Sequence, residues 1–444
     1  MICLCIILSS WFPITCQEPV TGNGGIICKA AAAGQILYRL TEPGEIISLL
    51  GTPRNKTARK DGGMDIMVLE YAGVNLTFGR QRNEEAVPFT LRRCTVNGKE
   101  LDIGRGKKLV LRSNADLCKL DSFRGFQDIG LQHTDLRTNA DLVSRMRFDT
   151  NTEWPCKKFL PSGFDPDALI ESGKNPGLGI RALHDQGITG KGIGIAVFDQ
   201  PLLLGHIEYT GRIARYDETG LCGMPPQMHG SPIASIAVGA STGVAPGAEL
   251  SYFAVPMWEK DNACYVKTLG KVMDLNKDLP PDERIRVVSI SDGSFSRKKH
   301  YEEWKTIVAA AEASGITVIT CDTSRITFGT LTLQPGENPD LPSSYNKGKY
   351  CFDFDDIRVP TGNKTIASHR GDSVYTFERE GGRSWASPYV AGLAAMALQI
   401  NPGLKPGEIF CLLTETAAKT AAGPVINPRE FIKGVQQHNK NPAK

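Results

Sequence analysis

The chain has 444 residues, of which 41% are hydrophobic and 22% charged, as in a folded protein long enough for two or three domains. Its formal net charge of +3 provides no argument for nucleic acid as a partner. Beyond the N-terminal segment no apolar run is long enough to span a membrane.

The N-terminal segment Ile2–Ile14 is apolar enough for the core of a signal peptide, although no Lys or Arg precedes it. We predict a signal peptide over residues 1–16 and a secreted or cell-envelope location, with a misplaced start codon as the alternative. Removal of this segment leaves nine of the twelve cysteines, an odd number that does not identify the compartment.

Two regions precede the C-terminal part of the chain. Residues 24–85 are predicted to form a small α+β module, because Ile46–Pro53 indicates a helix and a turn and Met67–Phe78 a strand hairpin. Residues 86–160 form a connecting region. There, Phe126–Leu136 fits a leucine-rich-repeat template that Val143–Asn151 partly repeats after 17 residues. An irregular linker is the alternative.

An apolar run ends in a carboxylate at Gly192–Asp199. The run predicts a buried parallel strand with Asp199 at its carboxyl end, the edge at which open α/β sheets place their chemistry. The alternative role for Asp199 is to cap the next turn.

The stretch His229–Gly239 predicts a helix with Ser231 as its N-cap and Pro232 as its first residue. His229 then stands on a glycine-containing turn just before this helix, and its alternative role is purely structural. Alternating strands and helices follow, which predicts an α/β fold with a doubly wound, mostly parallel sheet. These segments are Glu249–Val255, Tyr265–Leu279, Tyr301–Ser314 and Ile316–Cys321.

Ser384 follows a glycine turn and opens a helix made largely of small residues, within Gly382–Gly392. Backbone N–H groups collect at such a helix start, which suits the formation of an oxyanion. Simple N-capping is the alternative. Gly392 costs about 1 kcal/mol in a helix interior, so we expect close packing against the sheet there.

Together these segments place an acid, a base and a nucleophile in the order Asp199, His229, Ser384. A serine hydroxyl needs a base in contact, histidine accepts a proton near neutral pH, and a carboxylate orients the imidazole. The order argues against an α/β-hydrolase, whose acid and histidine follow its serine. The only histidine after Ser384 is His438, which lies in a polar tail.

These three segments resemble the signatures of the subtilisin-like serine peptidases, the subtilases, and the resemblance covers roughly Asp165–Ile432. It implies that Asp199, His229 and Ser384 are the charge-relay acid, the base and the nucleophile. Residues 165–435 would form a subtilisin-like catalytic domain. Asp199–Pro201 and Thr365–Phe377 look most like a divergent bacterial branch of the family.

One departure from the family concerns the oxyanion asparagine. The matching run is Val318–Ser324, in which Ser324 falls on the asparagine position and Asp322 reaches it with a small shift. A serine hydroxyl still donates a hydrogen bond, whereas an ionised Asp does not. Loss of one oxyanion donor slows catalysis by roughly 10²–10³.

The resemblance also assigns Ser291, Asp292 and Gly293 to the segment whose backbone pairs with the substrate as an added strand. Asp292 replaces a leucine of the family. It either faces the cleft and favours basic side chains or points to solvent. We expect no cofactor and can assign no metal ligands.

The sequence therefore predicts a serine endopeptidase that hydrolyses polypeptides through an acyl-enzyme. The alternative is a catalytically weak or inactive subtilase-fold protein that binds peptides or regulates a partner. The N-terminal region is either a propeptide or a retained interaction module, joined through Cys156–Pro166.

Overall fold

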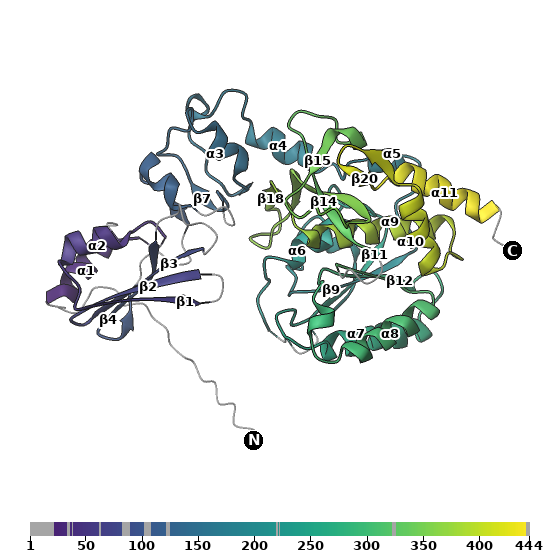
Figure 1. Ribbon diagram of the computed structural model, residues 1–444, viewed down its shortest axis with the longest axis horizontal. Helices are drawn as coiled ribbons and strands as arrows, with labels where there is room; N and C mark the ends of the chain where they lie inside the picture. The colour runs from purple at the N-terminus through teal and green to yellow at the C-terminus, as the bar shows by residue number, and fades with distance from the viewer. Residues whose placement is uncertain are drawn as a thin grey trace, which may run out of the picture. The chain divides into compact units, whose positions relative to one another are not determined.

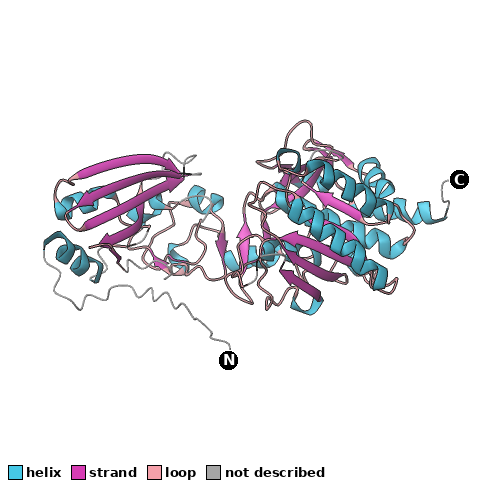
Figure 2. Ribbon diagram, turned by 90° about the horizontal axis from the view of Figure 1, so that it is seen from below, coloured by secondary structure: helices cyan, strands magenta, loops and turns pink. Residues whose placement is uncertain are grey.

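The computed structural model describes residues 22–32, 36–37, 39–61, 64–81, 89–101, 108–120, 125–218, 221, 223–321 and 326–440. The chain divides into two compact units, Met1–Phe164 and Asp165–Lys444, whose elements are drawn in Figures 1 and 2. Two predictions lie outside the described residues: the signal peptide over residues 1–16, and Ser324 with its neighbour Asp322.

The first unit begins with two helices and an antiparallel sheet. Its elements are α1 (Gly22–Ala32), α2 (Pro43–Leu50), β1 (Asn55–Asp61), β2 (Met64–Tyr71), β3 (Val74–Gln81), β4 (Thr90–Val96) and β5 (Lys99–Glu100), with the strands paired in that order. Alternate residues of β3, Val74, Leu76 and Phe78, are fully buried, as expected for a sheet with one covered face. They share a core with Ile27 of α1 and Ile46 of α2.

The predicted connecting region, residues 86–160, begins too early, because β4 and β5 pair with the sheet of the preceding module. The rest of it consists of short elements. They are β6 (Leu109–Val110), η1 (Asn114–Lys119), β7 (Ile129–Gly130), α3 (Ala140–Arg145), β8 (Phe148–Asp149) and η2 (Lys157–Phe159). Leu109 pairs in parallel with Ile129, a step of 20 residues. The leucine-rich-repeat interpretation stays a prediction, although this parallel step is typical of such repeats.

The second unit has an α/β fold built on a five-stranded parallel sheet in the order β10-β11-β9-β12-β13. The strands are β9 (Gly194–Asp199), β10 (Ile213–Glu218), β11 (Glu249–Ala254), β12 (Ile285–Ile290) and β13 (Thr317–Thr320). The associated helices are α6 (Gly230–Val238), α7 (Ala263–Asp278), α8 (Tyr301–Ala313) and α9 (Ala386–Ile400). The expected doubly wound sheet is thus present, with β9 at its centre.

The central strand β9 is buried on both faces, and its residues alternate between two cores. Ile195 and Val197 share a core with α6 and α9, whereas Ala196 and Phe198 share one with α7 and α8. Figure 1 shows α7 and α8 side by side at the edge of this unit. By the same alternation Asp199 belongs to the face covered by α6 and α9.

A second, mixed sheet in the order β15-β14-β16-β20-β19 and a hairpin of β17 and β18 complete the unit. The remaining strands are β14 (Phe328–Leu333), β15 (Tyr345–Lys347), β16 (Ile357–Gly362), β17 (Lys364–Ala367), β18 (Tyr375–Glu378), β19 (Ala418–Thr420) and β20 (Gly423–Val425). The remaining helical segments are α4 (Pro166–Gly173), α5 (Ile180–His184), η3 (Thr210–Arg212), η4 (Phe295–Arg297), η5 (Pro342–Ser344), η6 (Arg383–Trp385), α10 (Pro406–Glu415) and α11 (Pro428–Lys440). In the described part of the chain, no helix has the length and apolar character of a bilayer-spanning segment.

Candidate active site

Asp199 is the last residue of β9, and its side chain has no solvent exposure. Its Oδ1 accepts a hydrogen bond from the backbone N–H of Gln200 at 2.7 Å. Because β9 lies between β11 and β12, this carboxylate is placed at the centre of the carboxyl edge of the sheet.

His229 is the N-cap residue of α6, and its Nδ1 lies 2.8 Å from Oδ1 and 3.0 Å from Oδ2 of Asp199. A carboxylate can only accept, so Nδ1 carries the hydrogen of this contact and Nε2 is the basic nitrogen of the neutral ring. Burial lowers the pKa of His229, but the negative charge and hydrogen bond of Asp199 and the charge of Asp292 outweigh burial. The pKa is therefore raised above its ordinary value.

The helix after His229 begins earlier than the sequence predicted. Ser231 was expected to be the N-cap, whereas α6 starts at Gly230 and Ser231 lies inside the helix. The hydroxyl of Ser231 instead accepts a hydrogen bond of 2.9 Å from the hydroxyl of Tyr209. The histidine consequently sits directly at the helix start.

Ser384 lies in the short turn η6, and α9 begins two residues later at Ala386. The side chain is half-buried. The next residue, Trp385, places its ring 5.3 Å from the His229 ring, centroid to centroid, at an interplanar angle of 38°. The structure therefore brings the serine turn to the start of α6, beside the imidazole that contacts Asp199.

Ser291, Asp292 and Gly293 follow β12 and run beside the same turn. Ser291 Oγ donates a hydrogen bond of 2.7 Å to the backbone carbonyl of Ser384. The backbone carbonyl of Asp292 accepts one of 3.0 Å from the N–H of Cys321. Gly293 is exposed, and a Cβ on it would meet the carbonyl oxygen of Cys321 at 2.6 Å. This close approach requires glycine.

The Asp292 side chain is largely buried and forms an ion pair with Lys298. Lys298 Nζ lies 2.5 Å from its Oδ2, and the hydroxyls of Tyr265 and Ser294 donate bonds of 2.9 and 2.6 Å. Burial raises the pKa of Asp292, but the bonds from Lys298 and Ser294 reverse this effect and lower it overall. These contacts favour a structural role for this carboxylate.

Cys321 is the last described residue before the segment that carries Ser324. Its Sγ lies 3.1 Å from the hydroxyl of Ser387 and 3.4 Å from the carbonyl of Arg383. Burial raises the pKa of the thiol to about 12, so the thiol stays protonated at neutral pH. This residue therefore packs against the first turn after Ser384 as an uncharged group.

Sequence reasoning did not assign Trp385 or Lys298, although both lie beside predicted site residues. The signal for Trp385 was a single large side chain directly after Ser384 in a helix of small residues. Lys298 carried no comparable signal, because its ion pair with Asp292 is formed only in the folded chain.

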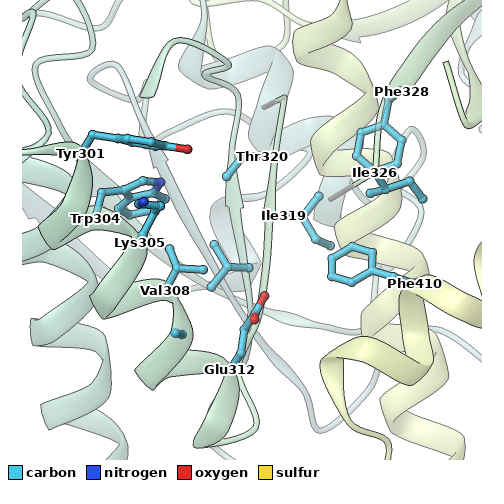
Figure 3. Close-up of a pocket in the computed structure, with 12 residues that line it drawn as sticks. Tyr301, Trp304, Lys305, Val308, Glu312, Ile319, Thr320, Ile326, Phe328 and Phe410 are labelled. Carbon is cyan, nitrogen blue, oxygen red and sulfur yellow. The ribbon is translucent and has the colours of Figure 1, made fainter. Parts of the chain in front are cut away.

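A cavity of about 280 Å³ lies between α8, β13 and α10. Figure 3 shows Tyr301 and Trp304 on one side of it and Phe328 and Phe410 on the other. None of the described residues that line it is a predicted site residue. Among the described residues, no group of three or more His, Cys, Asp or Glu side chains is placed to hold a metal ion.

A comparison with protein families matches residues 190–347 to the family model Peptidase S8, Subtilase family. Over this segment the chain is similar to the subtilases, a family of proteases.

Two solved structures match part of this chain. A chain of the subtilase cytotoxin SubAB assembly is 16% identical, with 60% of this chain and 97% of that chain covered and a TM-score of 0.47. The A-subunit of the AB5 toxin from E. coli is 17% identical, with 60% and 99% covered and a TM-score of 0.46.

Proposed function

We propose that this protein is a serine endopeptidase that cleaves polypeptides through an acyl-enzyme. The observation that carries the proposal is the contact between His229 and Asp199 at the end of the central strand, with the turn of Ser384 beside the imidazole. Ser, His and Asp in this relation are the groups that nucleophilic acyl transfer requires.

In the proposed mechanism, Ser384 Oγ attacks the carbonyl carbon of the scissile bond, and its proton passes to Nε2 of His229. The imidazolium then gives this proton to the leaving amine as the C–N bond breaks. Water, deprotonated by the same nitrogen, hydrolyses the serine ester and restores the hydroxyl. Asp199 stabilises the imidazolium and holds Nδ1 in its protonated form.

The oxyanion formed in each step is held by the backbone N–H of Ser384 in our proposal. This residue precedes α9, where the helix dipole adds positive potential. We infer that the hydroxyl of Ser324 supplies the second donor. Ser291, Asp292 and Gly293 would contribute backbone groups to peptide binding. The Lys298 contact argues against Asp292 as a selector of basic substrates.

The presence of serine at the family's asparagine position supports a second candidate function. In that case the protein binds peptides or regulates a partner with little or no catalysis.

We also propose a secreted or cell-envelope location from the apolar N-terminal segment, and a role for the first unit as propeptide or interaction module.

The proposal is tested with a fluorophosphonate probe and with casein. We expect the wild-type protein to be labelled at Ser384 and to degrade casein. In Ser384→Ala the labelling should be absent and the casein turnover rate should be roughly 10⁴–10⁶-fold lower. Ser172→Ala, which changes an exposed serine at the end of α4, should behave as wild type. Equal labelling of wild type and Ser384→Ala would contradict the proposal. Casein binding without turnover would favour the second candidate.

A further inference from the structure

Three aromatic side chains are exposed together on the loop between β15 and β16. Tyr350, Phe352 and Phe354 are 40%, 42% and 63% exposed, and we call them the aromatic patch. The rings of Phe352 and Phe354 are stacked in parallel, with centroids 5.2 Å apart and an interplanar angle of 5°. A grouped exposure of large apolar side chains is unfavourable in water and typically marks an interaction site.

The loop that carries the patch is held by hydrogen bonds to both backbone groups of Phe352 and to the backbone carbonyl of Phe354. The buried carboxylate of Asp355 accepts the backbone N–H of Phe352 at 2.5 Å. Arg358 Nη2 donates to the carbonyl of Phe352 at 3.2 Å, and Thr327 Oγ1 donates to that of Phe354 at 3.0 Å. The rings are therefore presented on a fixed backbone, which reduces the entropy lost when a ligand binds.

The same carboxylate connects the patch to the turn of Ser384. Arg383 Nη2 lies 2.7 Å from Oδ1 of Asp355, and Arg383 Nε donates to the carbonyl of Phe328 at 2.9 Å. The guanidinium carbon lies 5.5 Å from the ring centre of Phe352 and 6.0 Å from that of Phe354, within cation–π range. Because Arg383 directly precedes Ser384, one residue touches the patch and borders the candidate nucleophile.

The charges around the patch are paired. Lys347 Nζ lies 3.1 Å from Asp353, and Lys349 Nζ lies 2.9 Å from Glu380. The patch therefore offers apolar aromatic surface without a local excess of charge. This chemistry favours an apolar or aromatic side chain over an acidic one as the bound group.

We propose that the aromatic patch binds an apolar or aromatic side chain of the polypeptide substrate near the bond that Ser384 attacks. The inference rests on the proposed function, because it specifies which class of substrate side chain the proposed peptidase site prefers. An extended peptide advances about 3.3 Å per residue. A substrate bound across the turn of Ser384 would therefore reach the aromatic patch within a few residues of the scissile bond.

The experiment compares the full-length wild type with Phe352→Ala/Phe354→Ala, with Phe354→Ala alone, and with Leu341→Ala, an equally apolar exposed residue outside the patch. We expect the double variant to have about tenfold lower kcat/KM for casein, Phe354→Ala to have an intermediate value, and Leu341→Ala to match wild type. The rate of fluorophosphonate labelling, which needs no polypeptide contact, should stay within about twofold of wild type in all variants.

Several outcomes would overturn the inference. These are casein turnover unchanged in the double variant, an equal loss in Leu341→Ala, or a parallel loss of labelling, which would show that the rings act on the serine turn. A change in oligomeric state in sedimentation with unchanged turnover would assign the patch to self-association instead.

A binding measurement separates this inference from the proposed function. Fluorescent casein is titrated into Ser384→Ala with and without the two phenylalanine substitutions. About tenfold weaker binding after loss of the patch supports the inference even if the wild type proves inactive, and equal binding overturns it.

Discussion

His229 combines the contacts that decide the chemistry of the site. Its ring is bounded by the fully buried carboxylate of Asp199 on one nitrogen and by the Trp385 ring. The charge of Asp292 also acts on it, although the ion pair with Lys298 reduces this influence. The result is an imidazole with fixed orientation whose pKa is raised.

The raised pKa of His229 predicts the position of the acidic limb of the pH profile. A protonated imidazole cannot accept the serine proton, so activity is lost below this pKa. Because the pKa lies above the ordinary value of about 6.5, we expect kcat/KM to rise about tenfold per pH unit up to a midpoint above pH 6.5. Steady-state kinetics with a short peptide substrate measures this midpoint.

The raised pKa of His229 affects the free energy of unfolding in the opposite direction to activity: stability falls as the pH rises. Folding raises the pKa of His229, so its stabilising contribution is complete below the unfolded-state pKa and disappears as pH rises through the folded-state pKa. Circular dichroism across the same range checks that lost activity at low pH does not reflect unfolding. A midpoint below pH 6.5 in a folded protein would show that burial outweighs the carboxylates.

Two helices, α6 and α9, each begin at the site, and their close packing makes this possible. Both helices share the same core, and α9 consists largely of small residues. Gly392 of α9 approaches Val244 so closely that an added Cβ would lie 2.6 Å from the Cβ of Val244. The close packing expected at this glycine is present, but its nearest neighbours belong to the loop between α6 and β11 and not to the sheet.

Gly392→Ala is expected to lower the free energy of unfolding by about 2 kcal/mol, because the clash with Val244 exceeds the gain in helix propensity. Gly270→Ala is the matched control in the middle of α7, where a new Cβ meets nothing within 4 Å. It should stabilise the protein by up to about 1 kcal/mol. Urea denaturation compares the two, and a Gly392→Ala protein as stable as Gly270→Ala would contradict the packing argument.

The two units of the chain each possess a hydrophobic core of their own. Leu69 and Phe78 belong to the core of the first unit, whereas Val197 and Leu393 belong to a core of the second. Since a core of this kind is the basis of cooperative unfolding, each unit has what a separate folding domain requires.

We therefore expect two transitions when the full chain is unfolded in a calorimeter. Leu69→Ala, which empties part of the first core, should lower one midpoint by several degrees, and Gly392→Ala should lower only the other. A single transition that both substitutions shift equally would show that the units unfold as one.

Local patterns in the sequence were sufficient to predict several of the strands and helices of the second unit. The apolar run before Asp199 predicted a buried strand, and Gly194–Asp199 is buried throughout. The helix expected over Tyr301–Ser314 is found at Tyr301–Ala313. Such patterns succeed because burial and helix or strand periodicity are encoded within a few neighbouring residues.

Contacts between distant residues were decided only by the tertiary structure. The contact of His229 with Asp199, the pairing of Asp292 with Lys298 and the link from Arg383 to Asp355 all depend on how the strands are ordered and the loops folded. The N-cap prediction at Ser231 was wrong, since α6 starts at Gly230 and the Ser231 hydroxyl contacts that of Tyr209, 22 residues away. Periodicity identifies which residues are buried, whereas packing determines which of them meet.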